Sequence, residues 1–355
     1  MPPTPTQPAI GSPVPGYTNP TRWAGRTLTV ASLGGDYQDA QAAAMFEPFA
    51  AVTGVQVQQA LVGDLGELRQ QVENGQVTWD VVDIPTEDVV PLARADYLTP
   101  IDYQQVDRTP LFDEIILQHG VGAAFFSTVI VHLAAANPSP VGWSDFWDVA
   151  AFPGGRTLRG RAVGTLEFAL IADGVAPAAD ALYPLDIDRA FASLERLRPH
   201  VVQWYENQRQ PVALLLDGAV TMASSFSARV AGADDAAGVA IQWRGGMLAA
   251  DSWVVPRGAA NVDIAMDFIN FATRAITTAN FSRVQPFGPV NRGAFELLRE
   301  DRYAAMPNTP ERVPQQFVQN WAWWADHRDD LETRFRDWRL NAPDPTAEAS
   351  GRENP

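Results

Sequence analysis

The most constraining feature of the sequence is a short strand that runs directly into two glycines. Residues Thr27–Ser32 are rich in β-branched side chains, and Gly34-Gly35-Asp36-Tyr37 and an alanine-rich helical pattern over 37–52 follow at once. Glycine allows a tight turn and a close backbone approach, and a helix N-terminus carries partial positive charge. In an open α/β sheet such a turn lies at the carboxyl end of a strand, where ligands bind. We therefore expect Gly34, Gly35 and Tyr37 to line a ligand site, with Asp36 capping the following helix.

Strand and helix patterns alternate along most of the chain, which favours an α/β fold with a mostly parallel sheet and helices on both faces. An apolar run from Val121 to Leu133 contains Ser127 and Thr128. This run predicts a strand that crosses between two lobes, where the two hydroxyls either face a cleft or satisfy backbone groups. Further strands are expected near 55–59, 79–83, 220–223, 239–243 and 251–256, and helices near 64–73, 165–173, 188–197, 261–273 and 275–283.

The composition excludes several classes of function. The chain of 355 residues exceeds one average domain, so two lobes are expected. It contains no cysteine, which removes disulfides, thiolate metal sites and cysteine nucleophiles, and its four histidines are too scattered for metal-ligand spacing. All 26 basic residues are arginine, so mechanisms that need a lysine are excluded as well. The net charge of −16 argues against nucleic acid and anionic membrane surfaces as partners. We predict no metal and no cofactor.

The two ends of the chain differ in composition from the rest. Residues 1–22 are rich in Pro, Thr and Ser and lack the basic start and apolar core of a signal peptide. We expect 1–25 to form a flexible leader and the polar stretch 341–355 to form a flexible tail. No run of about 18 apolar residues is present, so no transmembrane helix is predicted.

A series of short motifs carries a resemblance to a known family. The chain resembles bacterial extracytoplasmic solute-binding proteins of ABC importers, in the spermidine/putrescine-binding group, over residues 26–340. Each motif is weak alone, and their order and spacing together carry the resemblance. They lie at Ser32–Tyr37, Pro48-Phe49 with Thr53-Gly54, Trp79–Val82, Trp143–Asp148, Phe152–Gly154, Leu170–Val175, Tyr183–Ala190, Ala250–Pro256, Asn261 with Phe268–Ala272, and Phe287–Asn291.

The resemblance implies a two-lobe fold of the periplasmic-binding-protein type II, with a solute held between lobes that close like a hinge. The first lobe would comprise 26–126 plus 254–300, and the second lobe 127–253 plus 301–340. The resemblance also implies a receptor without enzymatic activity, which delivers a small solute to the membrane permease of an ABC transporter. On this basis we expect a periplasmic monomer, while no signal peptide is visible in the sequence.

The same resemblance suggests particular pocket residues. Asp251 matches the family's ligand-facing acid after the inter-lobe strand, where a carboxylate either holds a ligand or forms hydrogen bonds within the hinge. Phe226 stands where the family usually places a tryptophan or tyrosine. Trp253 is either a pocket residue or part of the core. Phe287, in the last motif, is predicted to contact the ligand.

Departures from the polyamine-binding pattern point to a different solute. Ala249 replaces the tryptophan that polyamine binders place two residues before the acid, and Arg159 and Arg161 stand where a polyamine site has carboxylates. Both arginines are alternatively solvated or paired with surface acids. Since opposed like charges at short range cost about several kcal/mol when desolvated, a dication should disfavour a pocket that contains these arginines.

We therefore expect a small zwitterionic or anionic amine as the solute. The Gly34-Gly35 opening, with the segment 222–224 and Arg229, is similar to the subgroup that takes up 4-aminobutyrate-like amino acids. A primary ammonium needs a carboxylate and an aromatic face, and a carboxylate needs an arginine fork or free backbone N–H groups. The residues predicted for these roles are Asp251 and then Glu87 for the amine, Arg161 or Arg229 for the carboxylate, and Tyr37, Phe126, Trp204 and Phe226 for the walls.

Other classes stay open as alternatives. The first is a polyamine binder for putrescine or spermidine, and a further one is an oxyanion binder that uses Gly34-Gly35 and Ser224-Ser225. A carboxylate-dependent hydrolase is conceivable with 42 acidic residues, but no motif supports it. Because no Gly-x-Ser-x-Gly elbow, no cysteine and no histidine beside a plausible serine motif is present, we predict that the protein is not an enzyme.

Overall fold

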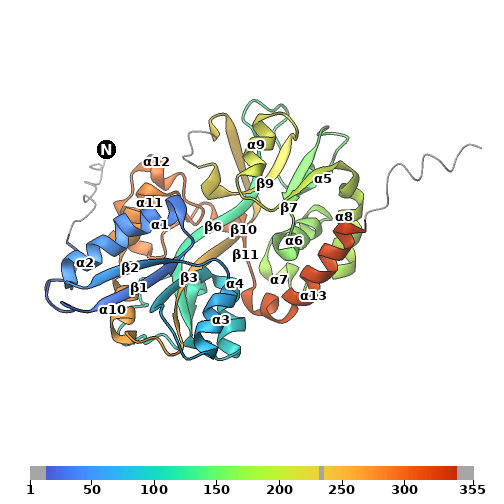
Figure 1. The fold of residues 1–355 in the computed structure, drawn as a ribbon. Coiled ribbons are helices and arrows are strands. Elements are labelled where there is room, and N and C mark those ends of the chain that lie inside the picture. Colours follow the sequence, from blue (N-terminus) through green and yellow to red (C-terminus); the bar gives the residue numbers. More distant parts are fainter. Residues whose placement is uncertain (1–12, 232–235, 342–355) are drawn as a thin grey trace, which may run out of the picture.

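One mixed β-sheet runs through the molecule and organises the rest of the fold. The structure is a computed structural model and describes residues 13–231 and 236–341. The main strand order is β2-β1-β3-β10-β6-β9-β7-β8, with three short strands attached to the two central ones (Figure 1). The two ends of this sheet carry separate sets of helices, which divides the molecule into a β1 half and a β7 half (Figure 1).

The β1 half contains strands β1 (Thr27–Ser32), β2 (Gln56–Leu61) and β3 (Val81–Pro85), and β1 pairs in parallel with both neighbours. Because β1 and β3 run parallel, their carboxyl ends lie at the same edge of the sheet. The helices of this half are α1 (Gly35–Gln41), α2 (Glu47–Thr53), α3 (Leu65–Glu73), α4 (Thr86–Arg94), α10 (Val262–Ala272), α11 (Ala275–Val284) and α12 (Glu300–Tyr303).

The β7 half contains strands β7 (Arg156–Arg159), β8 (Val201–Tyr205) and β9 (Met222–Phe226), and β7 again pairs in parallel with both neighbours. The long last helix packs on this half, so the end of the described chain returns to the β7 side (Figure 1). The helices are α5 (Trp143–Trp147), α6 (Ala162–Ala172), α7 (Ala179–Leu182), α8 (Ile187–Leu197), α9 (Gln210–Leu216) and α13 (Trp321–Leu340).

Two long antiparallel strands connect the halves. β6 (Gly120–Leu133) pairs with β10 (Val239–Pro256) at the centre of the sheet, β10 continues antiparallel to β3, and β6 continues antiparallel to β9. The predicted crossover strand is β6. The two strands predicted at 239–243 and 251–256 are the two ends of β10, which continues between them across an irregularity in its pairing with β6. The short strands are β4 (Leu98–Thr99), β5 (Ile116–Leu117) and β11 (Phe317–Val318).

Each half has its own hydrophobic core. In the β1 half, Trp253 is fully buried between Phe46 and Phe268, with ring centroids 6.4 and 5.4 Å away. In the β7 half, Trp143 stacks on Phe168 at 3.8 Å. Burial of each such large apolar side chain contributes about 1.5–3 kcal/mol to the free energy of unfolding. Each half can therefore keep its structure when the central strands bend.

The N-terminal segment corrects one prediction. Residues 13–25 were expected to belong to a flexible leader, but Val14 and Tyr17 are buried in the core of the β1 half. The Tyr17 hydroxyl donates a hydrogen bond of 2.8 Å to the backbone carbonyl of Asp267 in α10. This contact docks the segment, while residues 1–12 and the predicted tail at 342–355 lie outside the described residues.

The helix predicted over 37–52 forms as two α-helices separated by a π-helical turn, Ala42–Phe46. Such turns add a residue within one helix and shift the register of its faces. The other predicted helices form within a few residues of their expected bounds. Among the described residues, no helix combines the length and the apolar character that crossing a bilayer requires.

Candidate functional site

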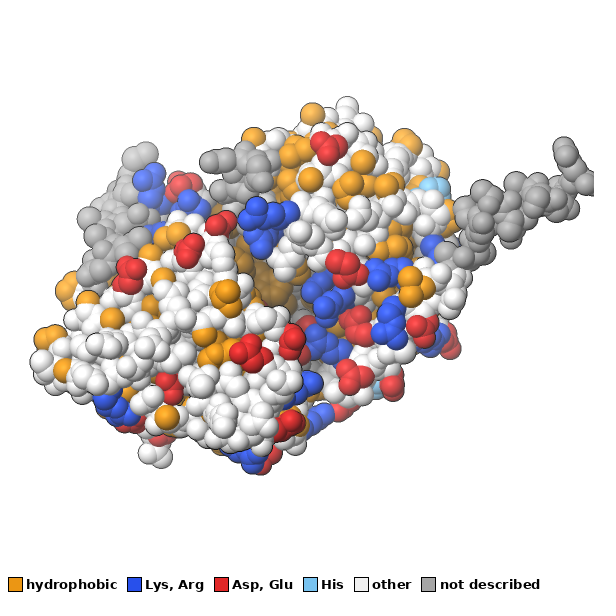
Figure 2. Space-filling model, viewed as in Figure 1, with side chains coloured by type: hydrophobic (Ala, Val, Ile, Leu, Met, Phe, Trp, Pro, Cys, Tyr) orange, Lys and Arg blue, Asp and Glu red, His pale blue; other side chains and the backbone are white. Residues whose placement is uncertain are grey.

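A cavity of about 530 Å³ lies where the two halves face each other. Figure 2 shows the hollow between them, with hydrophobic side chains on its floor and basic side chains at its rim. The β1 half contributes the turn between β1 and α1 and the start of α4, and the β7 half contributes the end of β7 and the segment after β9. The central strands β6 and β10 pass below the cavity. Both halves and both central strands therefore supply residues to one site.

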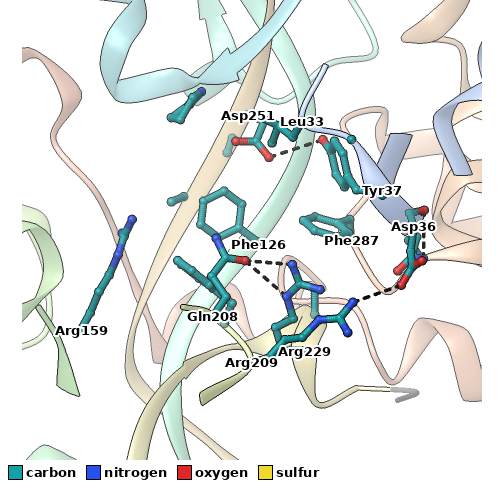
Figure 3. A pocket seen from close by; sticks show the side chains of 18 of the residues that line it. Leu33, Asp36, Tyr37, Phe126, Arg159, Gln208, Arg209, Arg229, Asp251 and Phe287 are labelled. Carbon is teal, nitrogen blue, oxygen red and sulfur yellow. Dashed lines mark hydrogen bonds and ion pairs between the residues drawn. The ribbon is translucent and has the colours of Figure 1, made fainter. Parts of the chain in front are cut away.

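One wall of the cavity is acidic. Asp251 on β10 lines the cavity and is 5% exposed, and Asp83 on β3 lies behind it and is fully buried. Trp253 pairs with Asp83 across the two strands, which places Asp251, two residues earlier on β10, on the same face as Asp83. The Tyr37 hydroxyl lies 3.0 Å from Asp83 Oδ2. It also lies 3.4 Å from Asp251 Oδ2 (Figure 3). Tyr37 therefore connects the two carboxyl groups.

Both carboxyl groups are held in a low-dielectric environment without a cation. Burial raises the pKa of Asp83 to about 7. Burial also raises the pKa of Asp251 well above its usual range, and the charge of Asp83 raises it further. Within residues 13–231 and 236–341, no arginine or histidine forms an ion pair with either group. An ammonium group placed beside Asp251 would supply the missing positive charge.

Aromatic rings form the middle of the cavity. Phe126 on β6 contacts Phe226 at the end of β9, with ring centroids 5.3 Å apart, and Phe287 at 6.4 Å. Phe287 in turn contacts Tyr37 at 4.8 Å. The rings come from both halves and from the central strands (Figure 3). They give the cavity an apolar surface suited to a short alkyl chain.

The opposite side of the cavity is basic. Arg159 is the last residue of β7, and its guanidinium lies over the Phe226 ring, 5.2 Å from the centroid. That guanidinium makes no hydrogen bond or ion pair with the described residues. Arg229 donates to Gln208 Oε1 at 3.0 Å, and Arg209 forms an exposed ion pair of 3.8 Å with Asp36 (Figure 3). Arg159 is thus the cation in the cavity best placed to receive an anionic group.

The family of the chain follows from comparison with known proteins. The family model of the bacterial extracellular solute-binding proteins matches residues 43–311. The chain belongs to this solute-binding family. A curated relative, the gamma-aminobutyric acid-binding protein of Pseudomonas aeruginosa, is 34% identical over 325 residues, which cover 88% of this chain and 91% of the relative.

Solved structures of other binding proteins have the same fold as this solute-binding protein. A GABA receptor structure matches with a TM-score of 0.83 and 33% identity, covering 90% of this chain and 99% of the receptor. The binding protein AgtB from A. tumefaciens R10, in complex with agropinic acid, matches with a TM-score of 0.75 and 31% identity, covering 89% and 99%. The predicted α/β fold of the type II periplasmic-binding-protein class, with strands crossing between two lobes, is therefore confirmed.

The structure brings together most of the residues that the sequence singled out for this solute-binding protein. The residues that it brings together come from six separate segments of the chain and line the same cavity. Nine of the predicted residues are among its lining: Gly34, Gly35, Tyr37, Glu87, Phe126, Phe226, Arg229, Asp251 and Phe287.

Five predicted site residues lie away from the cavity. Ser127 is buried and donates to Gln316 at 2.5 Å, and Thr128 is buried beside it. Trp253 lies in the core of the β1 half, because the face of β10 that is open at Asp251 is covered by α10 at Trp253. Arg161 is exposed outside the cavity. Trp204 packs on Phe335 and Trp338 of α13.

Two acidic residues at the rim have roles other than those expected. Glu87 lines the cavity, but Arg328 forms an ion pair with it at 2.7 Å and Gln319 donates to it at 2.6 Å, so its charge is already compensated. Asp36 does not cap α1: the N-cap is Gly34, which has no side-chain acceptor. Asp36 instead forms the ion pair with Arg209, which links the two halves across the mouth of the cavity.

Two functional candidates were not predicted in their roles. Arg159 was singled out with Arg161 as a departure from the polyamine-binding pattern but was not expected to hold the solute carboxylate, and Asp83 was not selected. Leu158 faces the core of the β7 half, and successive side chains of a strand point to opposite faces, so the arginine after it faces the cavity. This alternation was a usable signal. Asp83 ends an apolar run near the carboxyl end of β3, at the ligand-binding edge of the sheet. Its closeness to Asp251 depends on the pairing of β3 with β10, for which the sequence holds no local signal.

Among the described residues, no group of three or more histidine, aspartate or glutamate side chains has an arrangement that suits a metal ion.

Proposed function

We propose that this solute-binding protein captures a small zwitterionic amine, 4-aminobutyrate or a close analogue, and delivers it to the membrane permease of an ABC importer. One observation carries the proposal: among the described residues, a buried acidic wall without a cation and an arginine without an acidic partner occupy different sides of one aromatic cavity. A zwitterion with a short alkyl chain compensates both at once. The relatives named for gamma-aminobutyric acid support the same solute class.

The ammonium group would bind at Asp251. Its carboxylate lines the cavity and accepts at most the long contact from Tyr37, so its oxygens have capacity for N–H donors. A charge-assisted hydrogen bond of this kind, in a site shielded from water, is about twice as strong as a neutral one. The rings of Tyr37 and Phe287 stand beside this position and offer the aromatic surface that ammonium groups favour.

The carboxylate group would bind at Arg159. The fork of a guanidinium matches a carboxylate with two parallel hydrogen bonds, which fixes the direction of the solute as well as its charge. The Phe226 ring beneath the guanidinium restrains it in the cavity. Arg159 takes the role that was expected of Arg161 or Arg229.

A polyamine fits this cavity poorly. Three arginines line it, at positions 159, 209 and 229, and all belong to the β7 half. A second ammonium group of putrescine or spermidine would face this side, where like charges repel in a partly desolvated space. Glu87 is bound to Arg328 and therefore offers little compensation.

The proposal includes a location, a partner and a motion. The solute touches residues of both halves, so it favours the closed arrangement by population shift, with the crossing strands near 126–127 and 253–254 as the hinge. The closed form would act as a periplasmic monomer that docks on the permease and returns its solute chemically unchanged. The cross-cleft ion pair of Asp36 with Arg209 would form on closure.

Calorimetric titration with a panel of solutes tests the proposal. We expect 4-aminobutyrate to bind at micromolar or lower concentration, and putrescine and spermidine to bind at least about 100-fold more weakly, because two like-charge contacts of about 1.4 kcal/mol each give that ratio. The solute recovered afterwards should be unaltered by mass spectrometry. Tight spermidine binding with no heat from any zwitterion would contradict the proposal.

A further inference from the structure

We propose that Asp83 is a positioning residue that couples capture of the amine to release of one proton from the site. The inference rests on the proposed function, since it concerns the same acidic wall. It assigns a role to a residue that does not line the cavity and that would not touch the solute.

The first step of the argument is a count of hydrogen-bond donors. Tyr37 has one hydroxyl hydrogen, and its oxygen stands between Oδ2 of Asp83 and Oδ2 of Asp251. It can donate to only one of them. The second contact becomes a hydrogen bond when the other carboxyl group keeps its own proton and donates it to the phenol oxygen. Both contacts of the Tyr37 hydroxyl are therefore hydrogen bonds when the two acids together retain one proton.

The second step concerns the surroundings of Asp83. Its Oδ2 accepts from Gln41 Nε2 at 2.6 Å as well as from Tyr37, but its buried Oδ1 has no hydrogen-bond partner. The nearby Ser32 hydroxyl donates instead to Gln41 Oε1 at 2.6 Å. An ionised carboxylate with one bare buried oxygen is costly, since nothing solvates that side of the charge.

The third step lists the charges that face the pair. From β3 and β10 come Asp83 and Asp251 themselves, and from α1 comes Tyr37. From α4 come Glu87 and Asp88, whose negative charges act on Asp251 and which Arg328 of α13 holds in ion pairs. No cation on these elements contacts the pair itself, so two full negative charges there lack compensation until a solute arrives.

Binding of the solute therefore replaces the proton on the acid pair by the ammonium group of the solute. In the empty site near neutral pH, one carboxyl O–H bond is retained, in agreement with the raised pKa values of both acids. When an ammonium group binds Asp251, its charge favours ionisation of both carboxyl groups. That O–H bond then breaks, and the proton passes to water or buffer. The solute keeps its own protons, since the pKa of an alkyl ammonium lies at about 10.4.

The sign of the pH effect follows. Because binding releases a proton, the affinity for the amine should rise with pH, by at most about tenfold per pH unit for one proton. The slope should be present below about pH 7, the raised pKa of Asp83, and it should flatten at higher pH. A site that binds the same amine without proton exchange would show no slope in this range.

Calorimetry in several buffers measures the proton directly. With 4-aminobutyrate at pH 6.5, the binding heat of the wild-type protein should vary with the ionisation enthalpy of the buffer and give about 0.5 to 1 proton released per solute. Asp83→Asn should lower this number at least about twofold while solute binding persists, because it removes the negative charge that adds to the burial of Asp251 in raising the pKa of that acid. Asp188→Asn removes an exposed acid of α8 that does not line the cavity and should leave the number unchanged.

The possible outcomes separate the inference from the proposed function. If the wild-type protein binds 4-aminobutyrate with no proton released and no pH slope, the inference is wrong and the proposed function stands. If no zwitterionic amine binds at all, both are wrong. If Asp83→Asn releases as many protons as the wild type, Asp83 is not the coupled group. A wild-type pH series without a slope overturns the inference even when the variant does not fold.

Discussion

Replacement of Asp251 by asparagine should lower the affinity for 4-aminobutyrate by about 100-fold or more. Removal of one member of a buried, hydrogen-bonded charge pair costs about 2–5 kcal/mol, because the other charge is left without compensation. Glu87 also lines the cavity, but Arg328 holds it in an ion pair, so it cannot take over. Calorimetric titration of the variant with the solute measures this loss.

The Asp251→Asn variant should fold at least as well as the wild type. In the empty protein Asp251 is a buried acid without an ion pair, so a neutral amide of the same size removes a cost of burial. An unchanged or higher melting temperature would show that the loss of affinity is local. Asp36→Asn is the matched control: its exposed ion pair contributes about 0–1 kcal/mol, so the affinity should change by a few fold at most. Equal losses in the two variants would contradict the role of Asp251.

Replacement of Arg159 by glutamine should weaken 4-aminobutyrate binding by about 30-fold. The estimate corresponds to about 2 kcal/mol, which is typical for a hydrogen bond to a charged group. The same change should have little effect on 4-aminobutanamide, which keeps the ammonium group but carries no negative charge. The ratio of the two affinities, measured by titration, therefore isolates the contact with the carboxylate.

Arg161→Gln is the matched control for Arg159. It removes the same charge two residues further along the chain, outside the cavity, and should leave both affinities within a few fold of the wild type. The comparison also decides between the two positions, since the sequence favoured Arg161. If Arg161→Gln loses the selectivity for the carboxylate and Arg159→Gln keeps it, the geometry described for the cavity does not operate in the bound state.

Much of the fold could be predicted from local sequence signals. Strand β1 has the predicted bounds, because its β-branched run ends at two glycines that break it. The length of β10 was underestimated, because the strands expected at 239–243 and 251–256 are the two ends of one strand. Pairing with β6 up to Gln242 and again from Met247 holds both ends in one sheet, which is a tertiary effect. The docking of residues 13–25 through Tyr17 depends likewise on contacts with α10, far away in the sequence.

The site was predicted in part, for a related reason. Residues at the carboxyl ends of strands, such as Tyr37 just after β1, are placed by topology alone, so the sequence could find them. Strand alternation separates Arg159, which faces the cavity, from Leu158, which faces the core. It does not separate Arg159 from Arg161, two residues further along, which leaves the cavity because β7 ends at Arg159. Asp83 could not be found in this way, because its role depends on the distance to Tyr37 across separate strands and helices.

A crystal structure of the protein with 4-aminobutyrate tests the central claim most directly. The account predicts the ammonium nitrogen within about 3 Å of an Asp251 carboxylate oxygen, the solute carboxylate on the Arg159 guanidinium, and the alkyl chain against Phe126. A solute bound in the reverse direction, or bound outside this cavity, would contradict it.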